Sequence, residues 1–147
     1  MKQSFEQFMR QREEAARAYV RGNAQPLDRI VARSSDATFF GPQGGKVHGA
    51  SRVSSTYAND AQNLESDGRS RFEILQMVAD DDLGYWVGIQ HATLRMRGQP
   101  EAVPMDLRVT EVFRREEGEW KMVHRHADPL AHAPQAAQAM NAGGHQA

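Results

Sequence analysis

The apolar residues in the first half of the chain recur at helical spacing. Between residues 5 and 20 they fall every three or four positions, which is typical of a helix that buries one face. Pro26 fits the first turn of a second, shorter helix whose apolar side chains run to Val31. A third stretch begins at Gly49 and keeps the same spacing as far as Leu64. We therefore predict three helices in this half of the chain.

The second half of the chain changes to the pattern of strands. Four segments are rich in β-branched and aromatic residues and are separated by turn-like segments: residues 71–79, 85–96, 103–115 and 120–126. Two shorter strands are predicted at residues 38–40 and 46–48, on either side of a glycine-rich turn. Connections this short imply antiparallel pairing, because parallel neighbours need long crossovers. The pattern predicts an α+β fold with three N-terminal helices packed on a mostly antiparallel sheet.

The last predicted hairpin brings ionisable side chains to an apolar face. If the Glu-Glu-Gly-Glu segment before Trp120 forms the turn, Arg115 pairs with Trp120, and Glu111 then lies opposite His124. By alternation, Glu111, His124 and His126 point to the same side of the sheet. The apolar residues predicted on that side are Leu107, Val109, Phe113, Trp120 and Met122. A shift of one residue in the register would move all of these side chains to the opposite face.

Composition and charge narrow the class of protein. The 147 residues suit one domain, predicted at residues 1–130, followed by a tail at 131–147 that lacks apolar periodicity and is predicted to be disordered. Eighteen basic and nineteen acidic residues give a net charge of -1, which does not favour a nucleic-acid partner. No apolar run approaches the roughly 20 residues needed to span a membrane. No signal segment is recognisable, so we expect a cytoplasmic protein without a membrane partner. The absence of Cys excludes disulfides and thiolate chemistry.

The closing hairpin resembles that of a known superfamily. Residues 107–116 read LRVTEVFRRE, residues 118–120 read GEW, and residues 123–128 read VHRHAD. Together with YWVG at 85–88 and SDATF at 35–39, these segments resemble the SnoaL-like or ketosteroid-isomerase-like branch of the nuclear-transport-factor-2-like superfamily. The resemblance implies a cystatin-like cone, in which a curved sheet wraps around the helices and a pocket opens at the wide end. The superfamily contains isomerases, hydrolases, dehydratases, cyclases and non-catalytic binding modules.

The chain departs from the ketosteroid isomerase pattern at two of its three catalytic positions. In that family a Tyr on the first helix and a protonated Asp stabilise an oxyanion, and a second Asp is the base. Tyr19 can fill the first position, but the Asp-Pro pair that contains the base is replaced by Gly41-Pro42. Val109 or Thr110 stands in place of the acidic donor. The resemblance therefore does not extend to standard ketosteroid isomerase activity.

His124 and His126, with Glu111, are the candidate catalytic residues. An imidazole titrates near neutral pH and can act as a general acid or base, and a facing carboxylate can orient it. The alternative is a buried hydrogen-bond network that only stabilises the fold. His91 or Glu111 could add a third ligand to a metal site at the histidine pair, but no spacing specifies one. We predict neither a bound metal nor a cofactor.

Five further residues are predicted to line the pocket: Tyr19, Tyr57, Trp86, His91 and Asp128. Three functions stay open at this point. The protein is an isomerase, dehydratase or hydrolase acting on a small apolar molecule by proton transfer, a non-catalytic binding module for such a molecule, or an association domain. A homodimer through the convex sheet face is also predicted, because Val112 and Val123 lie among the charged residues expected there.

Overall fold

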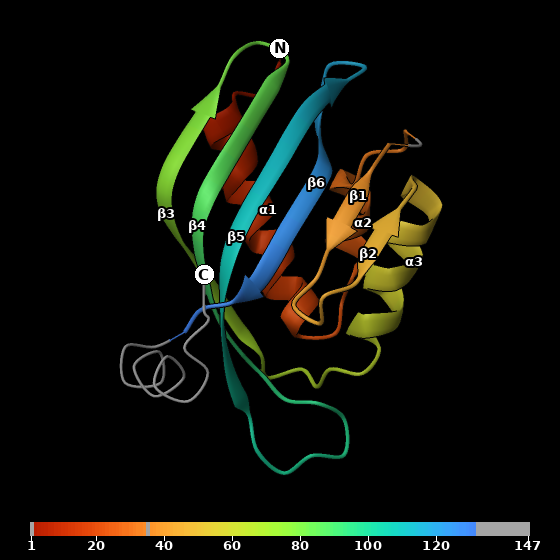
Figure 1. The fold of residues 1–147 in the computed structure, drawn as a ribbon, viewed down its shortest axis with the longest axis vertical. Coiled ribbons are helices and arrows are strands. Elements are labelled where there is room, and N and C mark those ends of the chain that lie inside the picture. The colour runs from red at the N-terminus through yellow and green to blue at the C-terminus, as the bar shows by residue number, and fades with distance from the viewer. Residues whose placement is uncertain (1, 35, 132–147) are drawn as a thin grey trace, which may run out of the picture.

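The computed structural model describes residues 2–34 and 36–131, and these form one α+β domain (Figure 1). The described residues form three helices: α1 (Phe5–Val20), α2 (Gln25–Ile30) and α3 (Ala50–Ala61). Their strands are β1 (Thr38–Phe40), β2 (Lys46–His48), β3 (Arg69–Ala79), β4 (Leu83–Leu94), β5 (Val103–Glu116) and β6 (Glu119–Pro129). The predicted fold class is confirmed. The predicted tail lies, apart from residue 131, outside the described residues. No helix in the described ranges combines the length and hydrophobicity that crossing a membrane requires.

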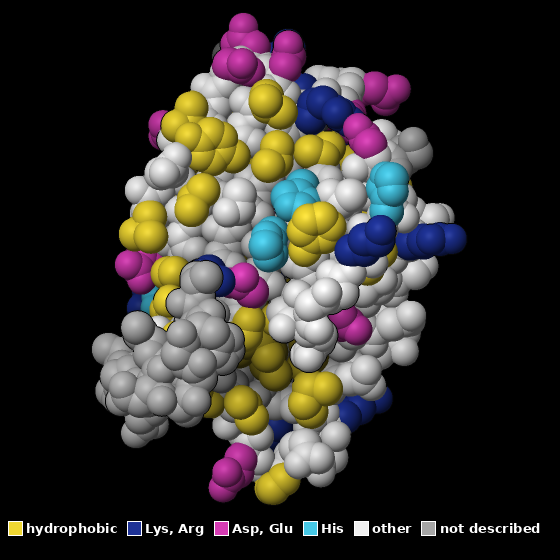
Figure 2. Space-filling model, in the orientation of Figure 1, with side chains coloured by type: hydrophobic (Ala, Val, Ile, Leu, Met, Phe, Trp, Pro, Cys, Tyr) yellow, Lys and Arg dark blue, Asp and Glu magenta, His cyan; other side chains and the backbone are white. Residues whose placement is uncertain are grey.

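The six strands form one sheet in the order β2-β1-β6-β5-β4-β3. All neighbours are antiparallel except β1 and β6, which run parallel over three residue pairs. The sheet curves, and its outer face is the one seen in Figure 2. Gly88 supports the curvature, because a Cβ atom there would lie 2.0 Å from the carbonyl oxygen of Glu73, close to the bulge between Ile74 and Gln76.

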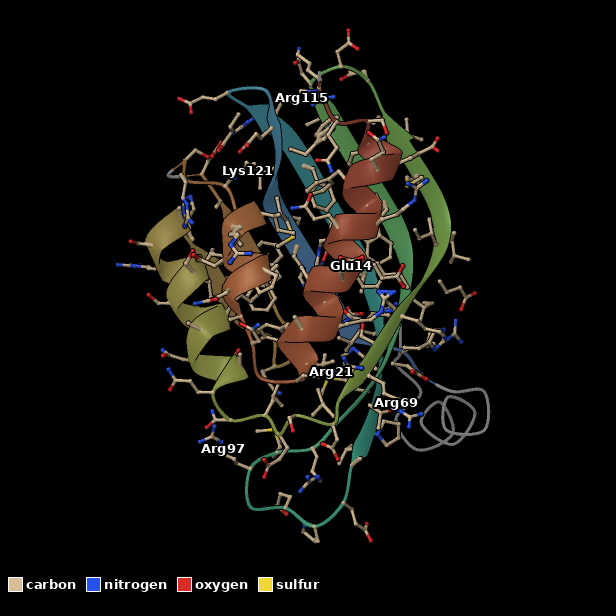
Figure 3. All side chains as sticks on the ribbon, turned by 180° about the vertical axis from the view of Figure 1, so that it is seen from behind. Glu14, Arg21, Arg69, Arg97, Arg115 and Lys121 are labelled. Atoms are coloured by element: carbon tan, nitrogen blue, oxygen red, sulfur yellow. The ribbon has the colours of Figure 1, made fainter. Side chains whose placement is uncertain are left out.

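Helix α1 lies across the inner face of the sheet (Figure 3). It begins with a capping box, in which the Ser4 side chain accepts from the amide of Gln7 and the Gln7 side chain accepts from the amide of Ser4. The face turned to the sheet carries apolar residues and also one buried charge, Arg12. The predicted helical spacing is therefore correct, and it places a guanidinium inside the domain.

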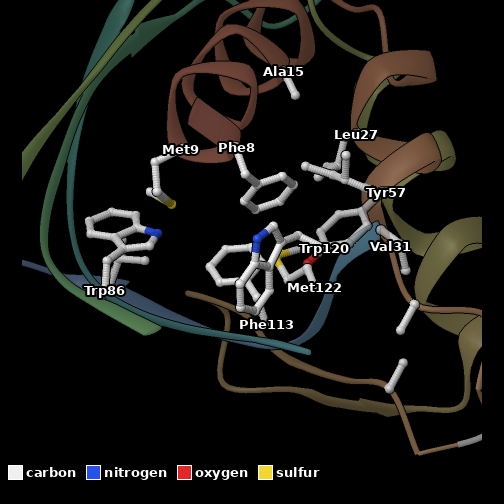
Figure 4. Close-up of a cluster of buried hydrophobic side chains, with 14 of the residues drawn as sticks. Phe8, Met9, Ala15, Leu27, Val31, Tyr57, Trp86, Phe113, Trp120 and Met122 are labelled. Carbon is white, nitrogen blue, oxygen red and sulfur yellow. The ribbon is translucent and has the colours of Figure 1, made fainter. Parts of the chain in front are cut away.

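The apolar core fills the space between α1, α2 and the middle of the sheet (Figure 4). Phe8 from α1 meets Phe113 from β5 with ring centroids 5.1 Å apart in an edge-to-face arrangement. Phe5 contacts Trp120 in the same way at 5.0 Å. Such aromatic pairs contribute about 0.5–1.5 kcal/mol each beyond the area that they bury. This cluster ties the helix to the β5–β6 hairpin.

A β-bulge in β6 overturns the predicted register of that hairpin. Pairing begins as expected, with Arg115 opposite Trp120, but one extra residue follows Met122 in β6. Glu111 then pairs with Arg125 instead of His124, and His126 pairs with Thr110 instead of Val109. Because one inserted residue reverses the facing of every side chain beyond it, the prediction that Glu111, His124 and His126 share the inner face was wrong. Arg125 faces inward with Glu111, and both histidines face outward.

Candidate functional site

Glu111 is the centre of a buried polar network. Its side chain is fully buried and accepts two hydrogen bonds from Arg12, with Nε 2.9 Å from Oε1 and Nη2 2.7 Å from Oε2. The indole Nε1 of Trp86 donates to Oε1 at 2.8 Å, and Nη1 of Arg125 donates to Oε2. A carboxylate with this set of donors has its lone pairs satisfied although no water reaches it.

The network fixes the charge of Glu111. Burial alone would raise the pKa of this carboxyl, but Arg12 and Arg125 outweigh it and hold the pKa at about 2. A group this acidic stays ionised at neutral pH and does not exchange protons there. The geometry therefore favours Glu111 as a fixed anion that positions two arginines.

Arg125 extends the network to the edge of the sheet. Its Nη2 donates to Oε1 of Gln90 at 2.7 Å, and Nε2 of Gln90 donates to Oγ of Ser70 at 2.9 Å. Gln90 and Ser70 come from β4 and β3 and are both buried. Hydrogen bonds thus run from α1 through β5 and β6 to β3, which holds the Arg125 side chain in one place.

A cavity of about 380 Å³ opens beside this network. It lies among the end of α1, helix α3, the turn between β1 and β2, and the ends of β4 and β5. Its apolar wall consists of Phe39, Val47, Leu64, Leu94, Met96, Met105 and Leu107. Its polar lining includes Tyr19, Tyr57, Asp60 and Arg125. An apolar pocket with a few convergent polar groups is the usual form of a small-molecule site.

The two tyrosines of the cavity differ in their surroundings. The Tyr57 ring is buried between Tyr19, at a centroid distance of 5.9 Å, and Phe39, at 4.8 Å. Its hydroxyl has no hydrogen-bond partner among the described residues. Tyr19 is only partly buried. Burial raises the pKa of both phenols, and for Tyr19 the nearby Asp60 adds to the rise. Both hydroxyls therefore remain protonated donors at neutral pH.

Asp60 is the carboxylate of the cavity rim. It follows Tyr57 by three residues on α3, so both side chains fall on the same face of that helix. Partial desolvation raises the pKa of the Asp60 carboxyl. It is exposed overall and thus accessible to a molecule at the cavity mouth.

The family of the chain follows from comparison with known proteins. A family model described as the SnoaL-like domain matches residues 11–131. The chain belongs to this SnoaL-like family. A comparison with curated protein sequences returns no significant match.

Solved structures share the fold of this SnoaL-like domain. A nuclear-transport-factor-2-like superfamily protein from Salmonella enterica has a TM-score of 0.74 at 14% identity, covering 87% of this chain and 92% of that one. A proposed dehydratase of the same family from Streptomyces avermitilis scores 0.72 at 20% identity, covering 85% and 94%. A ketosteroid isomerase-like protein from Erwinia carotovora atroseptica scores 0.68 at 13% identity, covering 84% and 94%. At these identities the likeness shows the fold alone.

The predicted pocket residues of the SnoaL-like domain separate into three places. Tyr19 and Tyr57 line the cavity. Trp86 is fully buried in the core, where it stacks on Phe72 and bonds Glu111, and it is not part of the cavity wall. His91 and Asp128 project from the outer face of the sheet, and the prediction that they line the pocket was wrong.

The outward residues have polar partners of their own. His91 contacts Glu73 through Nε2 at 2.8 Å and Asp106 through Nδ1 at 3.2 Å. Asp128 accepts two hydrogen bonds from Arg108, at 2.7 and 2.9 Å. The Arg108–Asp128 ion pair is largely exposed, and such a pair contributes roughly 0–1 kcal/mol.

His124 and His126 lie with Phe40 on the outer face, where Figure 2 shows two histidines next to an apolar side chain. Nδ1 of His124 is 2.7 Å from Oγ1 of Thr38, and Nε2 of His126 is 3.7 Å from a carboxylate oxygen of Asp128. Burial, with a smaller effect of His126, lowers the pKa of His124. Neither ring reaches the cavity. In the described part of the chain, no group of three or more His, Asp or Glu residues is arranged to hold a metal ion.

Sequence reasoning missed three polar residues of the site. Arg12 had a readable signal, because it follows Phe8 by four residues on the buried face of α1. Asp60 had a similar signal, three residues after Tyr57. Arg125 had none, because the bulge that turns it inward leaves no mark in the alternation of residues.

Proposed function

We propose that this SnoaL-like domain binds a small, largely apolar molecule in the cavity between α3 and the ends of β4 and β5. The observation that carries the proposal is the cavity itself, with apolar walls and a buried Tyr57 hydroxyl that lacks a protein partner. A volume of about 380 Å³ suits a ligand of modest size. The lining comes from α1, α3 and all the strands except β3, so the cavity depends on the assembled fold.

Filling the cavity tests this proposal. Leu94 lines the cavity, whereas its neighbour Thr93 points to the other face of β4. Small cyclic ketones, epoxides and alcohols are screened by thermal shift against the wild type, Leu94→Trp and Thr93→Trp. We expect ligands that stabilise the wild type and Thr93→Trp but not Leu94→Trp. Ligands that stabilise all three proteins equally would place binding elsewhere and contradict the proposal.

Catalysis by proton transfer is the second candidate, and Asp60 is the observation that favours it. Its pKa is raised and it shares the cavity with the Tyr19 phenol, so the two could act as base and hydrogen-bond donor in an isomerase, dehydratase or hydrolase. The Streptomyces protein of similar fold is a proposed dehydratase, which agrees with such chemistry. His124, His126 and Glu111 do not support it, because the histidines face away and Glu111 stays ionised.

An Asp60→Asn variant tests the catalytic candidate. For any ligand of the cavity that is turned over, this change should abolish turnover while leaving binding within about threefold, since one charge at an exposed rim contributes little to affinity. Asp67→Asn is the matched control, because Asp67 pairs with Arg95 outside the cavity. Unchanged turnover in Asp60→Asn would exclude Asp60 as the base.

We also propose a homodimer through the outer face of the sheet. Apolar side chains on that face include Phe40, Leu75, Val78, Tyr85, Val87, Ile89 and Val112. Leu75 is 64% exposed and Val78 is 54% exposed. A cluster of this kind on a soluble domain marks an interaction surface, and a second copy would cover both clusters at once through twofold symmetry.

A further inference from the structure

The buried charges beside the cavity do not balance. Arg12 and Arg125 are 2% and 8% exposed, and they share one carboxylate, Glu111. One positive charge is left over on two side chains that are almost wholly buried. The guanidinium of Arg12 lies 5.4 Å from the centroid of the Phe72 ring, which offsets part of this excess. An uncompensated buried charge is costly, so a further negative group in contact with these arginines would be favourable.

Unused hydrogen-bond donors lie in the same region. Among the described residues, Nη1 of Arg12 and the hydroxyl of Tyr57 are buried without a hydrogen-bond partner. The charges of Arg125, Glu111 and Arg12 all contribute to the pKa of Tyr57, and Tyr57 contributes to the pKa of Arg12. These groups are therefore close enough to interact electrostatically. Buried polar groups in native proteins are nearly always paired, and an unpaired one requires an explanation.

Arg125 connects this excess charge to the cavity. It lines the cavity together with Tyr57, and its two terminal nitrogens are engaged by Glu111 and Gln90. No hydrogen bond joins its Nε–H to the described residues. Arg125 and Tyr57 thus bring a charged side chain and a buried hydroxyl, which the described residues leave unpaired, to the same part of the cavity wall.

We propose that the cavity recognises a monocarboxylate, with the carboxylate at Arg125 and Tyr57 and an apolar body against Leu94, Met105 and Leu107. The inference rests on the proposed binding function and names its ligand class. A carboxylate offers two acceptor oxygens and one negative charge, which matches two donors and one surplus positive charge. A neutral ketone or alcohol could accept a bond but would leave the charge uncompensated.

Asp60 sets the direction in which such a ligand binds. Its carboxyl also lines the cavity, at the exposed rim. Repulsion between two carboxylates disfavours a ligand with its charged end at the rim. The charged end is therefore directed to Tyr57 and Arg125, and the apolar end to the cavity mouth.

A matched pair of probes separates charge from shape. Calorimetry at pH 7.5 and constant ionic strength compares cyclohexylacetate with cyclohexylacetamide, which has the same size but no charge. We expect the carboxylate to bind the wild type at least about tenfold more tightly, in line with a charge-assisted hydrogen bond replacing a neutral one. Leu94→Trp should abolish both interactions and thereby place them in the cavity.

Tyr57→Phe tests the proposed contact without disturbing the fold, because the hydroxyl that it removes has no protein partner. Carboxylate affinity should fall about tenfold, whereas amide affinity should change much less. Tyr85→Phe is the control, since the Tyr85 hydroxyl bonds Gln76 on the outer face. Arg125→Gln should remove the preference for the carboxylate, provided that circular dichroism shows a folded protein. Tyr57→Phe keeps the test valid if Arg125→Gln does not fold.

The outcomes distinguish the two proposals. Equal binding of amide and carboxylate in the cavity would overturn the carboxylate inference and leave the binding function intact. Carboxylate binding that Tyr57→Phe does not weaken would overturn the assigned contact. If neither probe nor any member of the neutral screen binds in the cavity, the proposed function itself fails and the inference fails with it.

Discussion

Ionisable side chains on the two faces of the sheet differ in burial and in partners, although Arg125 lies between His124 and His126 in the sequence. On the inner face, Glu111 and Arg125 are buried and bonded to each other, and the pKa of Glu111 is held at about 2. On the outer face, His124 is partly exposed and His126 is exposed, and among the described residues each ring has a single polar contact, with Thr38 and Asp128 respectively. The single extra residue at the bulge in β6 determines which of the following side chains point to the inner face and which to the outer face. On the inner face two arginines hold the pKa of the buried Glu111 at about 2, whereas on the outer face partial burial lowers the pKa of His124 from its ordinary value.

The largest effect is expected from removing the central anion. Glu111→Gln leaves Arg12 and Arg125 buried without a counter-charge, and it should lower the free energy of unfolding by about 3–5 kcal/mol. Asp128→Asn, which breaks an ion pair on the outer face, should cost less than about 1 kcal/mol. Urea denaturation of both variants checks the prediction. Similar losses in the two variants would mean that the faces do not differ as described.

Acid should act on the inner face in a defined range. The pKa of Glu111 is depressed from an ordinary value of 4.5 to about 2, so its contribution to stability is complete above the unfolded value and is lost as the pH falls from about 4.5 toward 2. Other carboxyls titrate there as well, so the comparison needs Glu111→Gln. The wild type should lose more stability than Glu111→Gln between pH 5 and pH 2.5, as measured by chemical denaturation at each pH. Parallel curves for the two proteins would contradict the assigned pKa.

A charge on the outer face should affect assembly and not folding. Val112 lies between Tyr85 and His124 in the cross-strand pairing, at the centre of the proposed dimer surface. Val112→Lys should convert a dimer of 16.5 kDa chains into monomers with the cavity still functional. Val103→Lys is the control. Val103 is 52% exposed and lies directly opposite Leu94, so both side chains point to the inner side of the sheet, away from the proposed dimer surface. Light scattering that shows a monomeric wild type at micromolar concentration would refute the dimer.

The smallest effect is expected from His124. Its pKa is lowered from 6.5, mainly by burial and to a lesser degree by His126, so the unfolded chain binds a proton more readily than the folded one. Stability from this group is complete above about pH 6.5 and decreases as the pH falls through the lower folded value. His124→Gln should flatten the pH dependence of the melting temperature between pH 7 and pH 5. An unchanged slope would show that another group is responsible.

Local periodicity predicted much of the fold. Helical spacing from Phe5 to Val20 and the switch to strand-like segments identified the helices and the antiparallel meander, because burial of one face imposes a period on the sequence. The hairpin register was also correct from Arg115 to Met122. Alternation alone did not decide whether Tyr85 or Trp86 points inward. The structure places Trp86 inside, where its indole N–H donates to Glu111.

The candidate site was less accessible to prediction, for a physical reason. A bulge changes the facing of the residues that follow it without changing their order or type, so His124 and Arg125 exchanged places relative to the prediction. The network also joins residues as distant as Arg12 and Glu111, which no local pattern relates. Tyr19 and Tyr57 fall at regular helical spacing in the sequence, and both line the cavity.

The turn between β1 and β2 covers one side of the cavity, and the way it is attached to the sheet affects how fast a ligand can exchange. Gly41, Pro42, Gln43 and Gly45 line the cavity from the turn between β1 and β2. Only three residue pairs join β1 to β6, whereas twelve join β4 to β5. Moving this turn away from the cavity therefore breaks only the short β1–β6 pairing and leaves the contacts among Arg12, Glu111 and Arg125 unchanged. Amide hydrogens of β1 and β2 should exchange with solvent sooner than those of β5, and the residence time of a ligand should be set by this local opening and not by unfolding of the domain.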